Sequence, residues 1–176
     1  MKFNYAVKVP KDRIAILVGT KGSIKNRIQK ELNVKLVIDS EEGDVDIEGE
    51  DSLNLLTAQN IVRAIGRGFN PEIAFDLLNE NNHFESLDIE EYVGDSKSKL
   101  TRIRARVIGE GGTARKTIED LTCTSVSVYG KTISIIGDYE GVSLARRAFE
   151  SLLNGSRHST VYSMLEKQRK KLKMRL

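Results

Sequence analysis

The sequence predicts an α+β fold made of two similar units in tandem, each a three-stranded antiparallel sheet covered by three helices, with a basic helical tail at the C-terminus. Two observations lead to this prediction. An aliphatic residue followed by G-x-x-G occurs at residues 18–22 and again at 108–112, so the two copies are 90 positions apart. After each copy the apolar residues first recur at helical spacing and then alternate as in a strand.

The flanks of the glycine motif repeat as well. Ile28 and Ile118 share the 90-residue offset, and so do Leu36 and Val126. Further along the chain the offset shortens because the turn between the two strands is shorter in the second copy. A tandem duplication is the natural explanation.

In the first unit the expected order is strand, helix, glycine turn, helix, two strands and a third helix. Ser23 is expected to cap the helix after the turn, and Asn33 to end it. Asn70 as a cap and Pro71 at the first helical position predict one more short helix. The expected strands are 4–9, 34–38 and 45–49, and the expected helices are 11–18, 23–32, 52–65 and 71–78.

The second unit is expected to follow the same order after a polar break at residues 79–82. We therefore expect three parts: a first domain with its linking helix at 1–82, a second domain at 83–158, and a basic tail at 159–176. The expected strands of the second unit are 86–93, 126–128 and 133–137, and its expected helices are 97–108, 113–121 and 142–153.

Positive charge gathers at both glycine turns and in the tail, although the net charge of the chain is only +3. Residues 1–31 carry a net charge of +6, residues 96–125 carry +4 and residues 157–176 carry +6, whereas residues 32–95 carry −13. This placement favours binding to a polyanion. The alternative, that the clusters are solvated surface, stays open.

Several classes of protein are disfavoured. The single cysteine, Cys123, allows no intrachain disulfide, and no apolar run approaches the roughly 20 residues that span a bilayer. His83 and His158 are far apart in sequence, and the glycine turns lack the Lys-Ser/Thr ending of a nucleotide-binding loop. We expect a soluble, cytoplasmic protein that is not an enzyme and has no catalytic residue, metal or cofactor.

Glycine has a physical purpose at the two turns. It tolerates positive φ and has no Cβ, so backbone N–H groups can approach a ligand closely. The helix that follows directs its N-terminal N–H groups to the same place, which favours a phosphate.

This order of elements, with an aliphatic residue before G-x-x-G, resembles the type I KH domain. In that family the loop clamps the backbone of about four single-stranded nucleotides while an adjacent groove contacts the base edges. The resemblance implies phosphate contacts at both loops, helped by nearby cations. The implied RNA-binding residues are Val18, Gly19, Thr20, Lys21, Gly22, Lys25 and Arg27 in the first unit, and Arg104, Arg106, Ile108, Gly109, Glu110, Gly111, Gly112, Arg115 and Lys116 in the second.

Glu110 departs from the family pattern, because the variable loop positions are usually basic or small. Its carboxylate would repel a phosphate unless it points to solvent or pairs with Arg106 or Arg115. A third alternative is that the second groove binds through backbone N–H groups and bases more than through charge.

Further segments make the resemblance more specific. Residues 64–72, 128–132, 135–137 and 155–162 are similar to archaeal tandem KH proteins related to the eukaryotic small-subunit assembly factor called partner of Nob one. This resemblance implies a role in ribosome biogenesis, with binding to the 3′ end region of 16S ribosomal RNA during its processing. The implied partners are the pre-small-subunit particle, the Nob one endonuclease and the alpha subunit of translation initiation factor 2.

A protein scaffold is the alternative function, because KH-like units can lose RNA binding and keep the fold. The acidic middle segment and Glu110 both allow one unit to face a protein. The tail has two interpretations as well: its cations either anchor RNA backbone or solvate the end of the chain.

Overall fold

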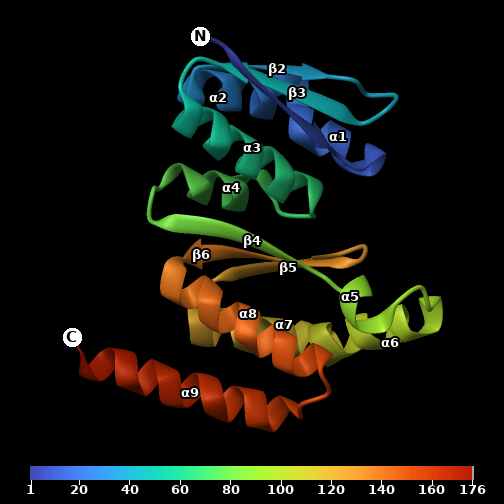
Figure 1. Cartoon of the computed structure of the whole chain (residues 1–176), viewed down its shortest axis with the longest axis vertical. Helices are drawn as coiled ribbons and strands as arrows, with labels where there is room; N and C mark the ends of the chain where they lie inside the picture. Colours follow the sequence, from blue (N-terminus) through green and yellow to red (C-terminus); the bar gives the residue numbers. More distant parts are fainter. Residues whose placement is uncertain (176) are drawn as a thin grey trace. The chain divides into compact units, whose positions relative to one another are not determined.

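A computed structural model describes residues 1–175 of the chain, which divides into two units (Figure 1). The first unit is Met1–Glu80, and the second begins at Asn81. Each unit is a three-stranded antiparallel sheet with helices on one face, as the sequence predicts.

In the first unit, strand β3 lies between β1 and β2, and helices cover one face of this sheet. Leu36 of β2 lies opposite Ile47 of β3, and both side chains are buried. Asp51 caps the third helix by accepting hydrogen bonds from the N–H groups of Leu53 (2.9 Å) and Asn54 (3.0 Å). The elements are β1 (Phe3–Lys8), α1 (Lys11–Val18), η1 (Thr20–Gly22), α2 (Ser23–Leu32), β2 (Val34–Ile38), β3 (Asp44–Gly49), α3 (Ser52–Gly66), α4 (Pro71–Ala74) and η2 (Phe75–Leu78).

The second unit repeats this topology, with β6 between β4 and β5. Val126 of β5 lies opposite Ile135 of β6, which is the counterpart of the pair in the first unit. The elements are β4 (Asn82–Asp88), α5 (Glu90–Val93), α6 (Lys97–Ile108), η3 (Glu110–Gly112), α7 (Thr113–Thr122), β5 (Ser125–Tyr129), β6 (Thr132–Asp138), α8 (Tyr139–Leu153) and α9 (His158–Met174).

Two local predictions were wrong. The strand expected at 86–93 begins earlier, at Asn82, and ends at Asp88, whose carboxylate accepts a hydrogen bond from the N–H of Glu90 (2.9 Å) and turns the chain into α5. Ser23 does not cap α2. The cap residue is Gly22, which makes no side-chain hydrogen bond and leads from the loop into the helix in a left-handed conformation (φ 75°).

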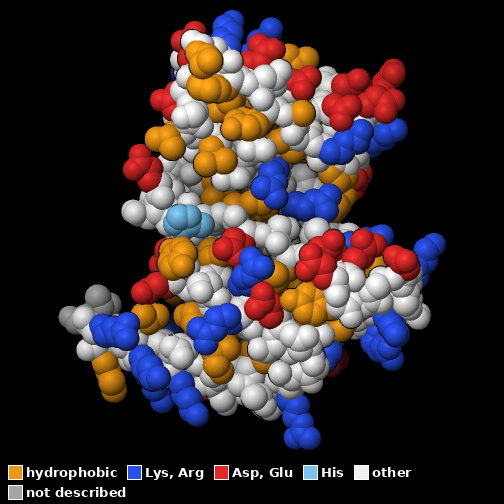
Figure 2. Space-filling view, in the orientation of Figure 1, with side chains coloured by type: hydrophobic (Ala, Val, Ile, Leu, Met, Phe, Trp, Pro, Cys, Tyr) orange, Lys and Arg blue, Asp and Glu red, His pale blue; other side chains and the backbone are white. Residues whose placement is uncertain are grey.

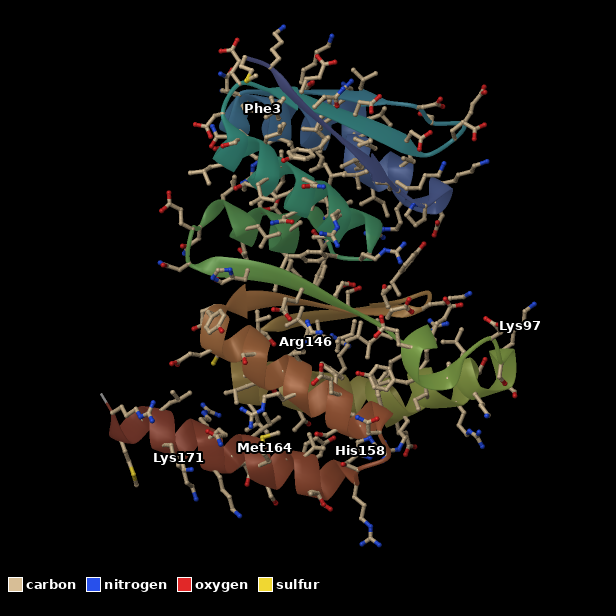
Figure 3. The ribbon with its side chains drawn as sticks, in the orientation of Figure 1. Phe3, Lys97, Arg146, His158, Met164 and Lys171 are labelled. Atoms are coloured by element: carbon tan, nitrogen blue, oxygen red, sulfur yellow. The ribbon has the colours of Figure 1, made fainter. Side chains whose placement is uncertain are left out.

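Helix α9 packs on α7 and α8 of the second unit. Val161 and Leu165 are buried in its core, with 2% and 1% of their surfaces exposed. His158 lies at the start of the helix, and Lys171 lies near its other end and points outward (Figure 3). The segment expected as a basic helical tail is therefore a helix, and its apolar side packs into the core of the second unit. Lys and Arg side chains gather along it, whereas acidic side chains gather at the turn between β2 and β3 (Figure 2).

In each unit an arginine caps the C-terminal end of a helix, which is α3 in the first unit and α8 in the second. Arg13 of α1 donates through Nε to the carbonyl of Ile65 (2.9 Å) and through Nη2 to that of Phe69 (2.8 Å). Arg106 of α6 donates through Nη1 to the carbonyl of Leu152 and through Nη2 to that of Ser156. These carbonyls belong to the last turn and the exit of α3 and α8, where backbone acceptors have no partner within the helix.

Candidate nucleic-acid interface

Each glycine loop is a short 3-10 turn between two helices. In the first loop the N–H of Gly22 donates to the carbonyl of Gly19 (3.2 Å), and in the second the N–H of Gly112 donates to that of Gly109 (3.1 Å). Val18 and Ile108, the last residues of α1 and α6, are half-buried. The ten-residue helices α2 and α7 begin directly after the loops, so their N-terminal ends face the place where the loops turn. The first N–H of each helix, from Ser23 or Thr113, donates to the loop carbonyl of Thr20 or Glu110.

Glycine is required at the first position of each loop. Gly19 has φ 75°, and a Cβ there would lie 2.5 Å from Cγ1 of Ile24. Gly109 has φ 78°, and a Cβ would lie 2.6 Å from the backbone nitrogen of Ala114. The loop therefore packs against the start of the next helix at a distance that only glycine allows.

The third loop position differs between the units. Lys21 takes a left-handed conformation with φ 54°, and Gly111 takes the same conformation with φ 62°. A lysine in this region is strained by about 1 kcal/mol or more, whereas glycine is not. The first loop thus holds an exposed cation on a strained backbone, beside the exposed Thr20.

The structure separates the cations expected around the first loop. Lys21 is exposed and Lys25 is half-buried on α2. The guanidinium of Arg27 stacks on the ring of Phe75, 3.8 Å from its centroid, and lies 3.3 Å from a carboxylate oxygen of Glu72. Arg27 therefore joins α2 to the segment after α3, and its charge is partly neutralised within the unit.

The cations expected around the second loop are also divided. The guanidinium of Arg106 donates hydrogen bonds to carbonyls at the end of α8. Nη1 of Arg115 lies 2.9 Å from Oε1 of Glu119. Arg104 is half-buried, and its Nε has no hydrogen-bond partner among residues 1–175. Lys116 is exposed.

Glu110 is exposed and forms no ion pair within the described part of the chain. Of the alternatives for this residue, the structure therefore favours a side chain in solvent, because both candidate arginines have other partners. The carbonyl of Glu110 accepts a hydrogen bond from the hydroxyl of Thr113 (2.8 Å), which closes the loop onto α7.

Two polar side chains that the sequence analysis did not single out lie beside the outer strands. Oε1 of Gln29 accepts a hydrogen bond from the N–H of Leu36 (2.9 Å), and Oε1 of Glu119 accepts one from the N–H of Val126 (2.7 Å). Both pairs share the 90-residue offset, so the repeat itself was the signal that could have found them. The side chain of Leu36 is only 2% exposed and belongs to the core.

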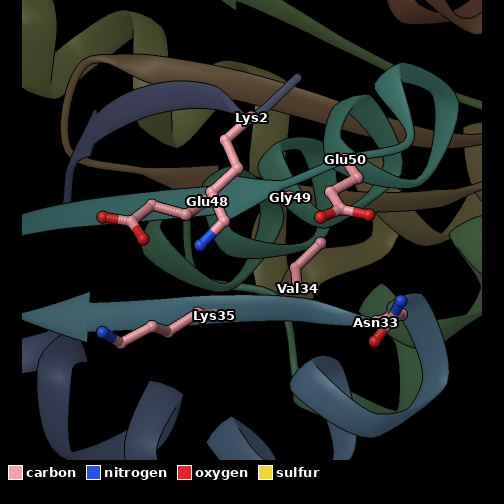
Figure 4. Close-up of a pocket in the computed structure, with 7 residues that line it drawn as sticks. All are labelled: Lys2, Asn33, Val34, Lys35, Glu48, Gly49 and Glu50. Carbon is pink, nitrogen blue, oxygen red and sulfur yellow. The ribbon is translucent and has the colours of Figure 1, made fainter.

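One hollow of the first unit lies away from its glycine loop (Figure 4). It has a volume of about 310 Å³ and lies where α2 ends, whereas the loop lies where α2 begins. Lys2 and Lys35 line it together with Glu48 and Glu50, so its charges balance. It offers no preference for an anion.

Two other kinds of site were sought. Within residues 1–175, no three His, Cys, Asp or Glu side chains are grouped so that they could hold a metal ion. None of the described helices has the length and apolar character needed to cross a membrane.

Comparison with known families matches both units. The model described as KH domain matches residues 4–64, and the model described as eukaryotic type KH-domain (KH-domain type I) matches residues 83–170. A KH domain-containing protein of Methanocaldococcus jannaschii is 47% identical over 171 residues, covering 95% of this chain and 74% of that protein.

Two further similarities extend the comparison. The RNA-binding protein pno1 of Drosophila melanogaster is 34% identical over 133 residues, and the match covers 73% of this chain but only 54% of the fly protein. A chain in the crystal structure of the a/eIF2alpha-aDim2p-rRNA complex from Pyrococcus horikoshii OT3 is 45% identical, with a TM-score of 0.90 and coverage of 97% of this chain and 96% of that one.

Proposed function

Because this chain belongs to the family of tandem KH-domain proteins that includes the pno1 and Dim2p proteins, we propose that it binds single-stranded RNA near the 3′ end of small-subunit ribosomal RNA and acts in maturation of that subunit. The observation that supports this most is the pair of glycine loops, each placed at the start of a ten-residue helix in a KH unit. The P. horikoshii relative was crystallised in a complex with rRNA.

The proposal assigns the RNA contacts to the two loops and to the cations beside them. In the first unit we assign Val18, Gly19, Thr20, Lys21, Gly22 and Lys25, and in the second Arg104, Ile108, Gly109, Glu110, Gly111, Gly112 and Lys116. Arg27, Arg106 and Arg115 contribute mainly by holding the helices beside the loops, because their guanidinium groups have partners within their own unit.

The partners follow from the same relatives. A complex with a/eIF2alpha is described for the P. horikoshii protein, and we propose the alpha subunit of initiation factor 2 as a partner here. We further propose the pre-small-subunit particle and the Nob one endonuclease, with the protein acting in the cytoplasm as a binding factor and not as a catalyst. The chain spans about half the length of the fly relative, so regions outside this match can add contacts in that protein.

The test is binding of a short RNA with the 3′-end sequence of small-subunit ribosomal RNA, against a scrambled RNA of equal length, over a salt series. We expect a preference for the native sequence that persists at high salt, where backbone contacts are screened. Equal, steeply salt-dependent binding to both RNAs would contradict base recognition. No binding to either RNA would favour the protein scaffold.

The loops are tested by Gly22→Asp combined with Gly112→Asp. Both glycines have left-handed φ angles of 75° and 77°, a conformation that aspartate tolerates, so the fold should persist. A carboxylate facing phosphate costs several kcal/mol, so RNA affinity should fall by at least about a hundredfold. Asn154→Asp adds one negative charge, as each loop substitution does, but at an exposed position outside the loops, and it should change affinity by less than about threefold.

A further inference from the structure

One edge strand of each sheet, β2 in the first unit and β5 in the second, presents backbone hydrogen-bonding groups to the helix that follows the glycine loop. β2 and β5 are edge strands, and the N–H groups of Leu36 and Val126 point away from the sheet, because they bond to side chains of α2 and α7. In an antiparallel strand the carbonyl of such a residue points to the same side as its N–H. At equivalent places in both units, the strand N–H is therefore occupied by a side chain of the helix, and in the second unit Nη1 of Arg115 also lies 3.5 Å from the carbonyl of Val126.

The side chains that occupy these donors differ in chemistry. Gln29 is a neutral amide with an acceptor oxygen and a donor nitrogen. Its oxygen accepts the hydrogen bond from the N–H of Leu36, so its NH₂ group remains as a donor. Glu119 is an acceptor only, and the N–H of Val126 and Nη1 of Arg115 both bond to the same oxygen, Oε1.

Glu119 is held in a fixed position beside the edge strand β5. Its side chain is 21% exposed, and it is fixed from one side by the strand and from the other by Arg115, whose Nη1 also lies 3.5 Å from the carbonyl of Val126. A carboxylate that is partly withdrawn from water forms strong hydrogen bonds with N–H donors and repels carbonyl oxygens.

We propose that Glu119 makes the groove of the second unit select bases with an exocyclic amino group and reject uracil, whereas Gln29 leaves the groove of the first unit tolerant of uracil. An amino group, such as N4 of cytosine, can donate to the carboxylate. Uracil presents a carbonyl oxygen at that position. The NH₂ group of Gln29 can donate to an acceptor on any base. The inference rests on the proposed function, because it concerns how the same grooves choose their RNA.

Cytosine and uracil are the sharpest pair of probes, since they are the same size and differ at position 4 in having an amino group or a carbonyl. The experiment measures the affinities of eight-nucleotide oligo(C) and oligo(U) for the full chain. To isolate the second groove, Gly22→Asp disables the first loop. To isolate the first groove, Gly112→Asp disables the second.

In the Gly22→Asp background we expect oligo(C) to bind about tenfold more tightly than oligo(U), which is the value of one charge-assisted hydrogen bond. Glu119→Gln should bring this ratio to within about twofold. The fold should be retained, because Gln29 makes the equivalent hydrogen bond to its strand in the first unit. In the Gly112→Asp background the ratio should be small, and Gln29→Glu should raise it.

An unchanged oligo(C) to oligo(U) ratio after Glu119→Gln would overturn the inference. So would a Gly22→Asp chain that binds neither oligonucleotide while the unmodified chain still binds the ribosomal 3′-end RNA, and in that case the proposed function would stand. Failure of the unmodified chain to bind any of these RNAs would instead remove the proposed function itself.

Discussion

Gly19 and Gly109 begin the two loops with nearly the same backbone angles, φ 75° and 78°, and each packs against the start of the next helix. Two positions later the first unit has Lys21 and the second has Gly111, although both are left-handed. The first loop position, where a side chain would clash with the next helix, is thus glycine in both units. The third loop position, which sets the charge of the loop, is different in the two units. Under the proposed function, this difference predicts two RNA sites with one architecture and separate preferences for their ligand.

The units also differ after their third helix. α4 begins five residues after α3 ends, and α9 begins five residues after α8 ends. α4 has 4 residues, whereas α9 has 17. In the first unit this region carries Phe75, on which Arg27 stacks, and in the second unit it supplies Val161 and Leu165 to the core. The second unit is therefore expected to depend on its additional helix for stability.

The largest expected effect tests that dependence. Leu165→Ala removes a side chain that is 1% exposed, and burial of this kind is worth about 2–5 kcal/mol. We expect the free energy of unfolding of the second unit to fall by about that amount, measured by hydrogen exchange of its core amides. Amides of the first unit should keep their protection, and the exposed Lys171→Ala should change neither unit by more than about 0.5 kcal/mol. Equal losses in both units would show that they unfold together.

The second largest expected effect concerns Arg13 and Arg106, which cap the ends of α3 and α8. Arg13→Ala removes the arginine donor from the carbonyls of Ile65 and Phe69, and Arg106→Ala removes it from those of Leu152 and Ser156. The carbonyls of Ile65 and Leu152 keep the backbone N–H groups of Gly68 and Gly155 as donors, so each variant should cost about 1–3 kcal/mol, mainly from the other carbonyl. Each substitution should destabilise its own unit and leave the other unchanged in urea unfolding followed by hydrogen exchange. Lysine in place of either arginine should recover less than half of the loss, because it lacks the two-pronged donor. Full recovery by lysine would mean that charge alone matters.

The smallest expected effect concerns the loops. Lys21→Gly relieves a left-handed lysine and should stabilise the first unit by up to about 1 kcal/mol. It also removes one phosphate contact, so the slope of log affinity against log salt should become shallower by about 0.7. The reciprocal Gly111→Lys should steepen the slope and destabilise the second unit. The comparison of the loops fails if either variant increases both the stability of its unit and the steepness of the salt dependence, or decreases both.

Much of the fold was predictable because the duplication supplies each pattern twice. The helices on both sides of each glycine loop, the strands around Leu36 and Val126, and the cap at Asn70 all agree with the structure. The strand expected at 86–93 failed because Tyr92 and Val93 continue an apolar pattern, whereas the turn is set by the side chain of Asp88. A single polar side chain can end a strand that the apolar pattern continues.

For the candidate site, the sequence predicted the position of both glycine loops and of the helices beside them. It predicted less well which cations near the loops have partners within their own unit. The sequence places Arg27, Arg106 and Arg115 close to the loops. It cannot show that Phe75 and Leu152 are the partners of Arg27 and Arg106, because these contacts join segments more than 40 residues apart. The pair of Arg115 and Glu119 is different, because residues four apart on one helix are neighbours. Gln29 and Glu119 were missed for a related reason. Their importance depends on the direction of one strand N–H, which composition and spacing do not express.

Arg13 and Arg106 bind equivalent carbonyls, yet they are not equivalent residues of the repeat. At the 90-residue offset Arg13 corresponds to Ile103, and Arg106 corresponds to Ile16. After the duplication the same contact came to be made from positions one helical turn apart, because the acceptors are backbone groups that any donor of the right reach can satisfy. An alignment of the two halves column by column would score both arginines as lost, although the interaction is present in each half.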